Sequence, residues 1–115
     1  MNQEALKERC KVLALRVMSL IDHLPKSVQG RVIADQIMRS ASSVAANYRA
    51  ACRARSKAEF VAKLSIVVEE ADETVLWLEL IKDRKLLPEN RVGNLLEEAN
   101  EITAIMVASR KTDSS

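Results

Sequence analysis

The chain has 115 residues, of which 48% are hydrophobic and 3% aromatic, and its formal net charge is +2 at pH 7. This length is that of one ordinary domain with a single core. With only two glycines and two prolines, the composition is typical of long helices and excludes a fold rich in tight turns.

Neither an export signal nor a membrane span is predicted from the sequence. Charged residues interrupt residues 1–16, where a signal peptide needs an apolar segment. The longest apolar run, 104–108, is far shorter than the roughly 18 residues of a transmembrane helix. Cys10 and Cys52 are expected to be buried, reduced thiols, because secreted stapled domains carry several cysteines. The protein is therefore expected to be cytoplasmic.

Apolar residues recur at helical spacing in four segments. The first predicted helix covers about 3–23 and ends at Leu24-Pro25. The second covers about 28–54, and Ser27 can cap it because its hydroxyl can accept a hydrogen bond from a free backbone amide. Its apolar face uses small residues, most clearly in the run 40–46.

The third predicted helix covers about 57–85 and begins with a capping-box pattern, Ser56 with Glu59. We place a break at Ser56, because one helix from 28 to 85 would be far longer than usual. The fourth covers about 88–110, with Pro88 at its first position. Residues 111–115 are expected to fray.

Four helices joined by short connections must run antiparallel. The predicted fold is therefore all-α: an antiparallel up-down-up-down four-helix bundle, formed by a single domain over residues 1–110. The second and third helices are expected to be the longest, at about 40 Å, and to set the long axis.

The second and third predicted helices carry opposite charge. Residues 26–57 include seven basic and one acidic residue, whereas residues 58–81 include one basic and six acidic residues. Helical spacing places four arginines of the second helix on one outward stripe about 33 Å long. The following connection adds two more cations. The stripe and its extension are Arg31, Arg39, Arg49, Arg53, Arg55 and Lys57.

This stripe suits the phosphates of RNA or DNA, because arginine presents a planar fork and clustered cations gain by releasing counterions. No aromatic residue lies among the arginines, so contacts to the backbone are expected rather than base stacking. The alternative is structural. The arginines can pair with acidic residues of another subunit's third helix, or Arg39 can pair with Asp35 in its own helix. The acidic candidates are Glu69, Glu70, Asp72 and Glu73.

The third helix also carries apolar residues on more than one side, which is typical of a subunit contact. The alternative is a wide core face with a few exposed apolar residues. The candidate oligomer interface is Val61, Val68, Val75, Trp77, Glu70 and Glu73.

No catalytic, metal or cofactor site is predicted. His23 is the only histidine, and it lies beside a connection, so neither a di-metal carboxylate site nor a nucleophile with its base can be assembled. The protein is not expected to be an enzyme.

A spaced pattern runs through the middle of the chain: Asp35-Gln36-Ile37, Arg39, Ser43-Val44, Asn47 and Arg55-Ser56-Lys57-Ala58-Glu59-Phe60. In this pattern the sequence resembles the four helix bundle protein family, also called the 23S rRNA intervening-sequence proteins, over about residues 10–105. The resemblance implies a small bacterial protein whose antiparallel bundles assemble into homopentamers. A related group, the accessory variability determinants of diversity-generating retroelements, forms basic pentameric barrels. The implied partners are thus further copies of the chain, RNA or DNA, and a reverse transcriptase or another protein.

The sequence departs from the family pattern twice. Many members have Asn-Ile-Ala-Glu-Gly where this chain has Asn47-Tyr48-Arg49-Ala50-Ala51, and Gly-Ser where it has Glu69-Glu70. The first change adds an arginine to the stripe and the second adds acid to the third helix. Two functions remain open: a nucleic-acid-binding accessory factor, or an oligomeric scaffold for a protein partner whose arginines join its subunits.

Overall fold

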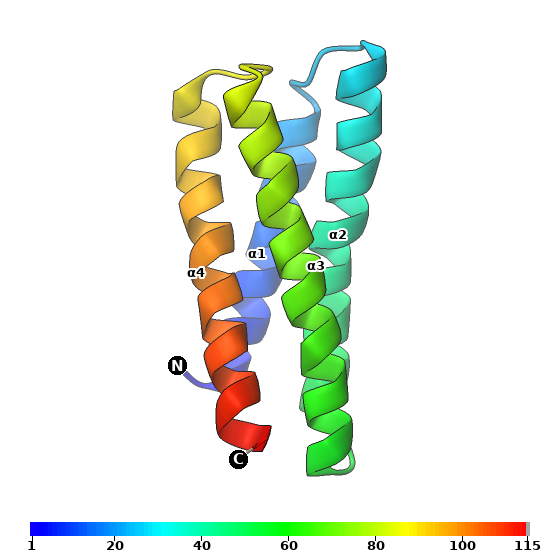
Figure 1. The fold of residues 1–115 in the computed structure, drawn as a ribbon, viewed down its shortest axis with the longest axis vertical. Coiled ribbons are helices and arrows are strands. Elements are labelled where there is room, and N and C mark those ends of the chain that lie inside the picture. Colours follow the sequence, from blue (N-terminus) through cyan, green and yellow to red (C-terminus); the bar gives the residue numbers. More distant parts are fainter. Residues whose placement is uncertain (115) are drawn as a thin grey trace.

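The computed structural model describes residues 1–114, with side chains described as far as Thr112. It contains four helices, α1 (Gln3–Ile21), α2 (Val28–Cys52), α3 (Lys57–Asp83) and α4 (Glu89–Ser114). Successive helices run antiparallel, and both chain ends lie at the same end of the bundle (Figure 1). The predicted four-helix bundle is confirmed.

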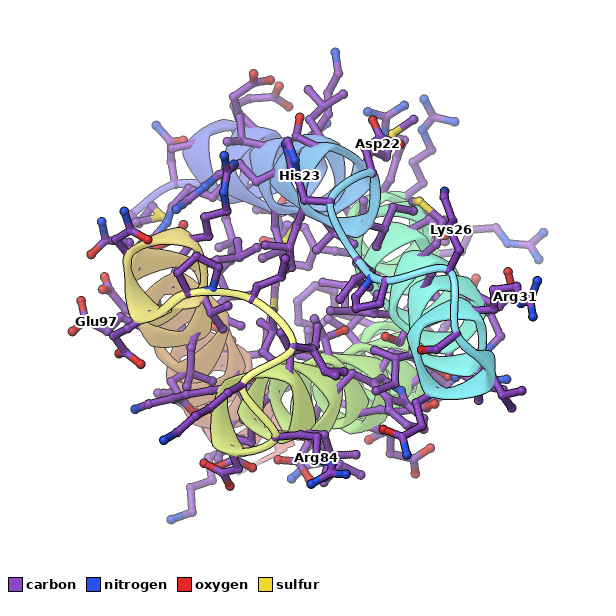
Figure 2. All side chains as sticks on the ribbon, turned by 90° about the horizontal axis from the view of Figure 1, so that it is seen from above. Asp22, His23, Lys26, Arg31, Arg84 and Glu97 are labelled. Atoms are coloured by element: carbon purple, nitrogen blue, oxygen red, sulfur yellow. The ribbon has the colours of Figure 1, made fainter. Side chains whose placement is uncertain are left out.

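Seen down the long axis, the helices stand at the corners of a square in the order α1, α2, α3, α4 (Figure 2). Each helix therefore packs against two neighbours, and α1 and α4 pack least closely. The molecule measures 44 × 21 × 20 Å along its principal axes. This arrangement places the basic helix α2 directly beside the acidic helix α3.

The helix bounds lie within two residues of the predicted ones, except at the end of α4. The expected fraying of 111–115 is wrong for 111–114, which are helical, and residue 115 lies outside the described part. The expectation that α2 and α3 are the longest is correct for α3, which has 27 residues, but wrong for α2, because α4 has 26 residues and α2 has 25. In the last turns of α4, Ser109 and Thr112 line the same cavity as Tyr48, near the end of α2, and Phe60, near the start of α3.

Three side chains cap helix starts, as helix N-termini require. Asn2 accepts a hydrogen bond from the Ala5 backbone N–H at 2.8 Å. Ser27 accepts from the Gly30 N–H at 3.1 Å, and Ser56 accepts from the Glu59 N–H at 3.0 Å. The predicted caps at Ser27 and Ser56 are confirmed. The return bond of the capping box goes to Arg55, whose backbone N–H donates to Glu59 at 3.4 Å.

The α2–α3 contact contains the two buried polar side chains of the described core, Ser40 and Thr74. Their hydroxyl oxygens are 2.8 Å apart and share a hydrogen bond. Thr74 also bonds the Glu70 carbonyl at 2.9 Å. Because every hydroxyl here has a partner, the pair sets the register of α2 against α3 without leaving a polar group unsatisfied.

The two helical glycines give a matched test of packing. A Cβ on Gly30 would lie 1.9 Å from the Pro25 carbonyl oxygen, whereas a Cβ on Gly93 would meet only the flexible end of Glu89, at 3.0 Å. We expect Gly30→Ala to lower the free energy of unfolding by about 1–3 kcal/mol through the backbone clash. Gly93→Ala should raise it by about 0.5–1 kcal/mol. Urea unfolding followed by circular dichroism measures both, and equal effects would contradict the role of the Pro25 carbonyl.

Candidate nucleic-acid interface on α2

Three arginines of the predicted stripe, Arg31, Arg49 and Arg53, are exposed on the outer side of α2. Within the described residues, no carboxylate lies at ion-pair distance from any of these three guanidinium groups. Figure 2 shows Arg31 projecting away from the bundle. These side chains are therefore available to an external anion.

Arg39 behaves differently, because it lies at the edge of α2 that faces α3. Its Nη1 donates to Glu70 at 3.0 Å, and its Nη2 donates to Glu73. Its Nε contacts the Gln36 side-chain oxygen at 3.4 Å. Glu70 and Glu73, which were expected to pair with arginines of another subunit, thus pair with an arginine of the same chain. The expected i,i+4 pair of Arg39 with Asp35 does not form.

The Arg39 pairs also set the electrostatics of α3. Hydrogen bonding from Arg39 lowers the pKa of Glu73 below its ordinary value, against a smaller opposing effect of burial. The Trp77 indole N–H donates to the same carboxylate at 3.3 Å and lowers that pKa further. The same carboxylates raise the pKa of Arg39, mainly through Glu73. Arg39 therefore joins α2 to α3 rather than remaining a free cation.

Without Arg39 the stripe is discontinuous. Arg31 stands alone near the start of α2, about 27 Å from Arg49 along the helix. The other four cations gather around the α2–α3 connection, and we name them the basic end cluster: Arg49, Arg53, Arg55 and Lys57. Arg55 is 91% exposed, and its pair with Glu59 is long, at 3.8 Å. Arg53 caps α2, where the helix dipole favours a cation.

The predicted oligomer interface on α3 needs correction. Val75 is only 6% exposed and belongs to the core of the bundle. Val68 and Trp77 are half-buried and pack against this core, and Val61 is half-buried. Glu70 and Glu73 are already engaged by Arg39. The expectation failed for Val75 because α3 packs against α2 on one flank and α4 on the other, so one helix buries more than one apolar stripe.

The largest exposed apolar side chains of α2 and α3 lie elsewhere, at residues outside the predicted interface. Val28 is 72% exposed, Val32 51% and Leu80 40%, and together with Leu86 they line a groove of about 420 Å³ between α2 and α3. We name this feature the apolar groove. Leu76, 47% exposed, lies one turn from Leu80 on α3. The i,i+4 spacings of Val28 with Val32 and of Leu76 with Leu80, outside the main apolar stripes, were the available signal.

The remaining candidate chemistry is limited. Burial raises the pKa of the Cys10 thiol to about 12, so this cysteine stays protonated and is a poor nucleophile. Cys52 is half-buried, and both cysteines are free thiols. Across the described residues, no cluster of histidine, cysteine and carboxylate side chains could hold a metal ion. None of the described helices is both long enough and apolar enough to cross a membrane.

Arg39→Gln should show the pH dependence of the α2–α3 ion pairs. Because the folded pKa of Glu73 is lowered, the pair stabilises the fold above the unfolded-state value of about 4.3, and this stabilisation is lost as the pH falls through the lowered folded value. We expect Arg39→Gln to lower the urea midpoint slightly at neutral pH and to have a progressively smaller effect in acid. Arg31→Gln, which removes an unpaired arginine of the same helix, is the control. An equal deficit at neutral pH and at about pH 2 would contradict this assignment.

Comparison with known proteins agrees with this fold. Residues 3–108 match the family described as 23S rRNA-intervening sequence protein. A crystal structure of a protein of unknown function, from the S23 ribosomal protein family of Bacteroides thetaiotaomicron, is 31% identical to the chain. The two superpose with a TM-score of 0.86 over 96% of this chain and 99% of that one. No curated protein matches the chain. Since the family match spans nearly the whole sequence, the chain belongs to the 23S rRNA-intervening sequence protein family.

Proposed function

We propose that this protein is a non-enzymatic, cytoplasmic accessory factor that assembles as a homo-oligomer and binds the backbone of RNA or DNA. The binding residues are Arg31 and the basic end cluster, Arg49, Arg53, Arg55 and Lys57. Arg39 supports the site by holding α2 on α3.

The observation that carries this proposal is the contrast between Arg39 and its neighbours. Arg39 shows that α3 can neutralise an arginine of α2, yet Arg49 and Arg53 are exposed and have no carboxylate partner in the described structure. Like charges one turn apart on a helix repel weakly, and an anion that lies against Arg49 and Arg53 relieves this repulsion. Phosphate groups fit, because each arginine fork can donate two hydrogen bonds to phosphate oxygens.

Backbone contact is favoured over base reading, because each described aromatic side chain is engaged by the protein itself. Tyr48 is buried, Phe60 packs against the core, and the Trp77 indole donates to Glu73. Without a free stacking surface, the site is expected to recognise charge density rather than base sequence. The name of the family and that of the similar crystal structure both refer to the ribosome, which agrees with a nucleic-acid partner.

The combined change Arg49→Glu and Arg53→Glu should abolish most nucleic-acid binding. With about four phosphates contacted, the affinity of the unmodified protein for mixed-sequence RNA should fall with salt with a logarithmic slope of roughly −3 to −4. The double variant should bind at least tenfold more weakly and show a shallower slope. Fluorescence anisotropy at several salt concentrations measures both quantities.

The control for this experiment is Lys82→Glu with Lys85→Glu, which changes the net charge equally but lies at the end of α3 opposite the cluster and outside the apolar groove. Light scattering on each variant checks that the oligomer is unchanged. If the control pair weakens binding as much as the cluster pair, or if the unmodified protein binds no RNA at low salt, the proposal is wrong.

The apolar groove supports a second function, an oligomeric scaffold for a protein partner such as a reverse transcriptase. An exposed, mainly aliphatic surface of this kind is typical of a subunit or partner contact. The subunit number expected from the family resemblance is five. In this reading the copies of the chain, rather than a nucleic acid, cover α2 and α3.

Val32→Lys with Leu80→Lys should dissociate the oligomer into folded monomers, because two charges would be buried in the contact. The matched control is Leu15→Lys with Met18→Lys, since Leu15 and Met18 on α1 are 51% and 49% exposed. Size-exclusion chromatography with light scattering gives the mass, and circular dichroism confirms the fold. Dissociation by the α1 pair alone would place the contact on the other side of the bundle.

A further inference from the structure

The seam between α1 and α4 contains one fully satisfied ion pair. Arg9 on α1 donates to Glu98 on α4 through Nε at 3.0 Å and Nη2 at 2.5 Å, and Nη2 also lies 3.1 Å from Glu101. The Arg9 and Glu98 side chains are only 22% and 21% exposed. At this level of the α1–α4 contact, two carboxylates thus neutralise one arginine.

Two helical turns along the same seam, two positive charges take the place of the opposite charges. Arg16 lies seven residues after Arg9 on α1, and Arg91 lies seven residues before Glu98 on α4. Because the two helices are antiparallel, these positions face each other as Arg9 and Glu98 do. The structure confirms the register, since Arg16 and Arg91 line one cavity of about 310 Å³. Arg91 therefore occupies the position on α4 at which a carboxylate would repeat the Arg9–Glu98 pair.

No described carboxylate compensates this pair. Neither Arg16 nor Arg91 has an ion-pair partner among the described residues, and the nearby Glu89 lies 3.8 Å from Lys82 instead. His23 lines the same cavity, from the α1–α2 connection. Two cations that line one cavity without a counterion repel each other, so the arrangement favours an anion that binds between them.

The rest of the cavity suits a phosphate group. The buried side chains of Leu20 and Leu95 form its floor, and the Ser19 hydroxyl and Asn90 carboxamide add neutral donors. Asn90 and Arg91 belong to the first turn of α4, where free backbone amides and the helix dipole favour negative charge. Two guanidinium forks match the tetrahedral oxygens of a phosphate better than a planar carboxylate.

We propose that Arg16, Arg91 and His23 form a binding site for a terminal phosphate group, carried by a free nucleotide or by the 5′ end of a nucleic-acid strand. In Figure 2 His23 lies at the α1 corner, away from Arg31 on α2. The basic end cluster lies at the α2–α3 connection, at the opposite end of the bundle from this cavity, so the site is separate from it and stands independently of the proposed function.

Because His23 is the only histidine, its ring C–H signals in an NMR spectrum report on this cavity alone. At constant pH and ionic strength, titration with inorganic phosphate and with adenosine monophosphate should move these signals saturably, and sodium chloride should not. A 5′-phosphorylated oligonucleotide compared with its 5′-hydroxyl form separates the two sources of phosphate. A preference for the phosphorylated strand indicates a nucleic-acid end, and saturation by the mononucleotide without that preference indicates a free nucleotide.

Arg91→Glu is the decisive variant, because it supplies Arg16 with the kind of partner that Arg9 already has. It should abolish the saturable shift while leaving the melting temperature equal or higher. Arg16→Gln should weaken binding by about tenfold or more. Arg84→Gln, an exposed arginine elsewhere, should have no effect, and Arg49→Glu with Arg53→Glu should leave phosphate binding intact.

The site is refuted if no saturable shift appears up to about 10 mM phosphate or mononucleotide. It is equally refuted if Arg84→Gln weakens binding as much as Arg16→Gln, or if Arg91→Glu binds as tightly as the unmodified protein.

Discussion

The close packing of α2 on α3 is the constraint on which the rest of the molecule depends. Small side chains on α2 let the helices approach, and the buried Ser40–Thr74 hydrogen bond fixes their relative register. Because a buried hydroxyl without a partner is costly, a slip of one helix along the other would be penalised at this point. The ion pairs of Arg39 with Glu70 and Glu73 lie on the outside of this contact, whose register the buried hydrogen bond sets.

This contact explains how a chain of small net charge presents a basic surface. The two helices of opposite charge are neighbours within one subunit, so their charges neutralise each other where the edges of the helices meet. Arg39 is at that edge, whereas Arg49 and Arg53 are exposed and have no carboxylate partner among the described residues. The overall charge of +2 is therefore a poor guide to the field at any one surface, because charges more than about 10 Å apart are largely screened from each other.

The α1–α4 seam follows the same logic with a different result. Near Arg9 the antiparallel register brings opposite charges together, and two turns away it brings Arg16 to Arg91. Loose packing between these helices leaves room for a cavity at the level where the charges repel. Two basic features thus arise at opposite ends of the bundle: the basic end cluster at the α2–α3 connection, and the phosphate site proposed beside the start of α4.

Local features were determined by the sequence itself: four helices, their caps at Ser27 and Ser56, and the exposure of Arg31, Arg49 and Arg53. Helical periodicity and capping depend on residues a few positions apart, so they can be predicted from the sequence alone. Only the tertiary structure decided that Val75 is core, that α3 of the same chain holds Arg39, and that Arg16 faces Arg91. Those outcomes depend on which helix stands beside which and in what register, and this is set by long-range packing, which the spacing of residues along a single helix does not specify.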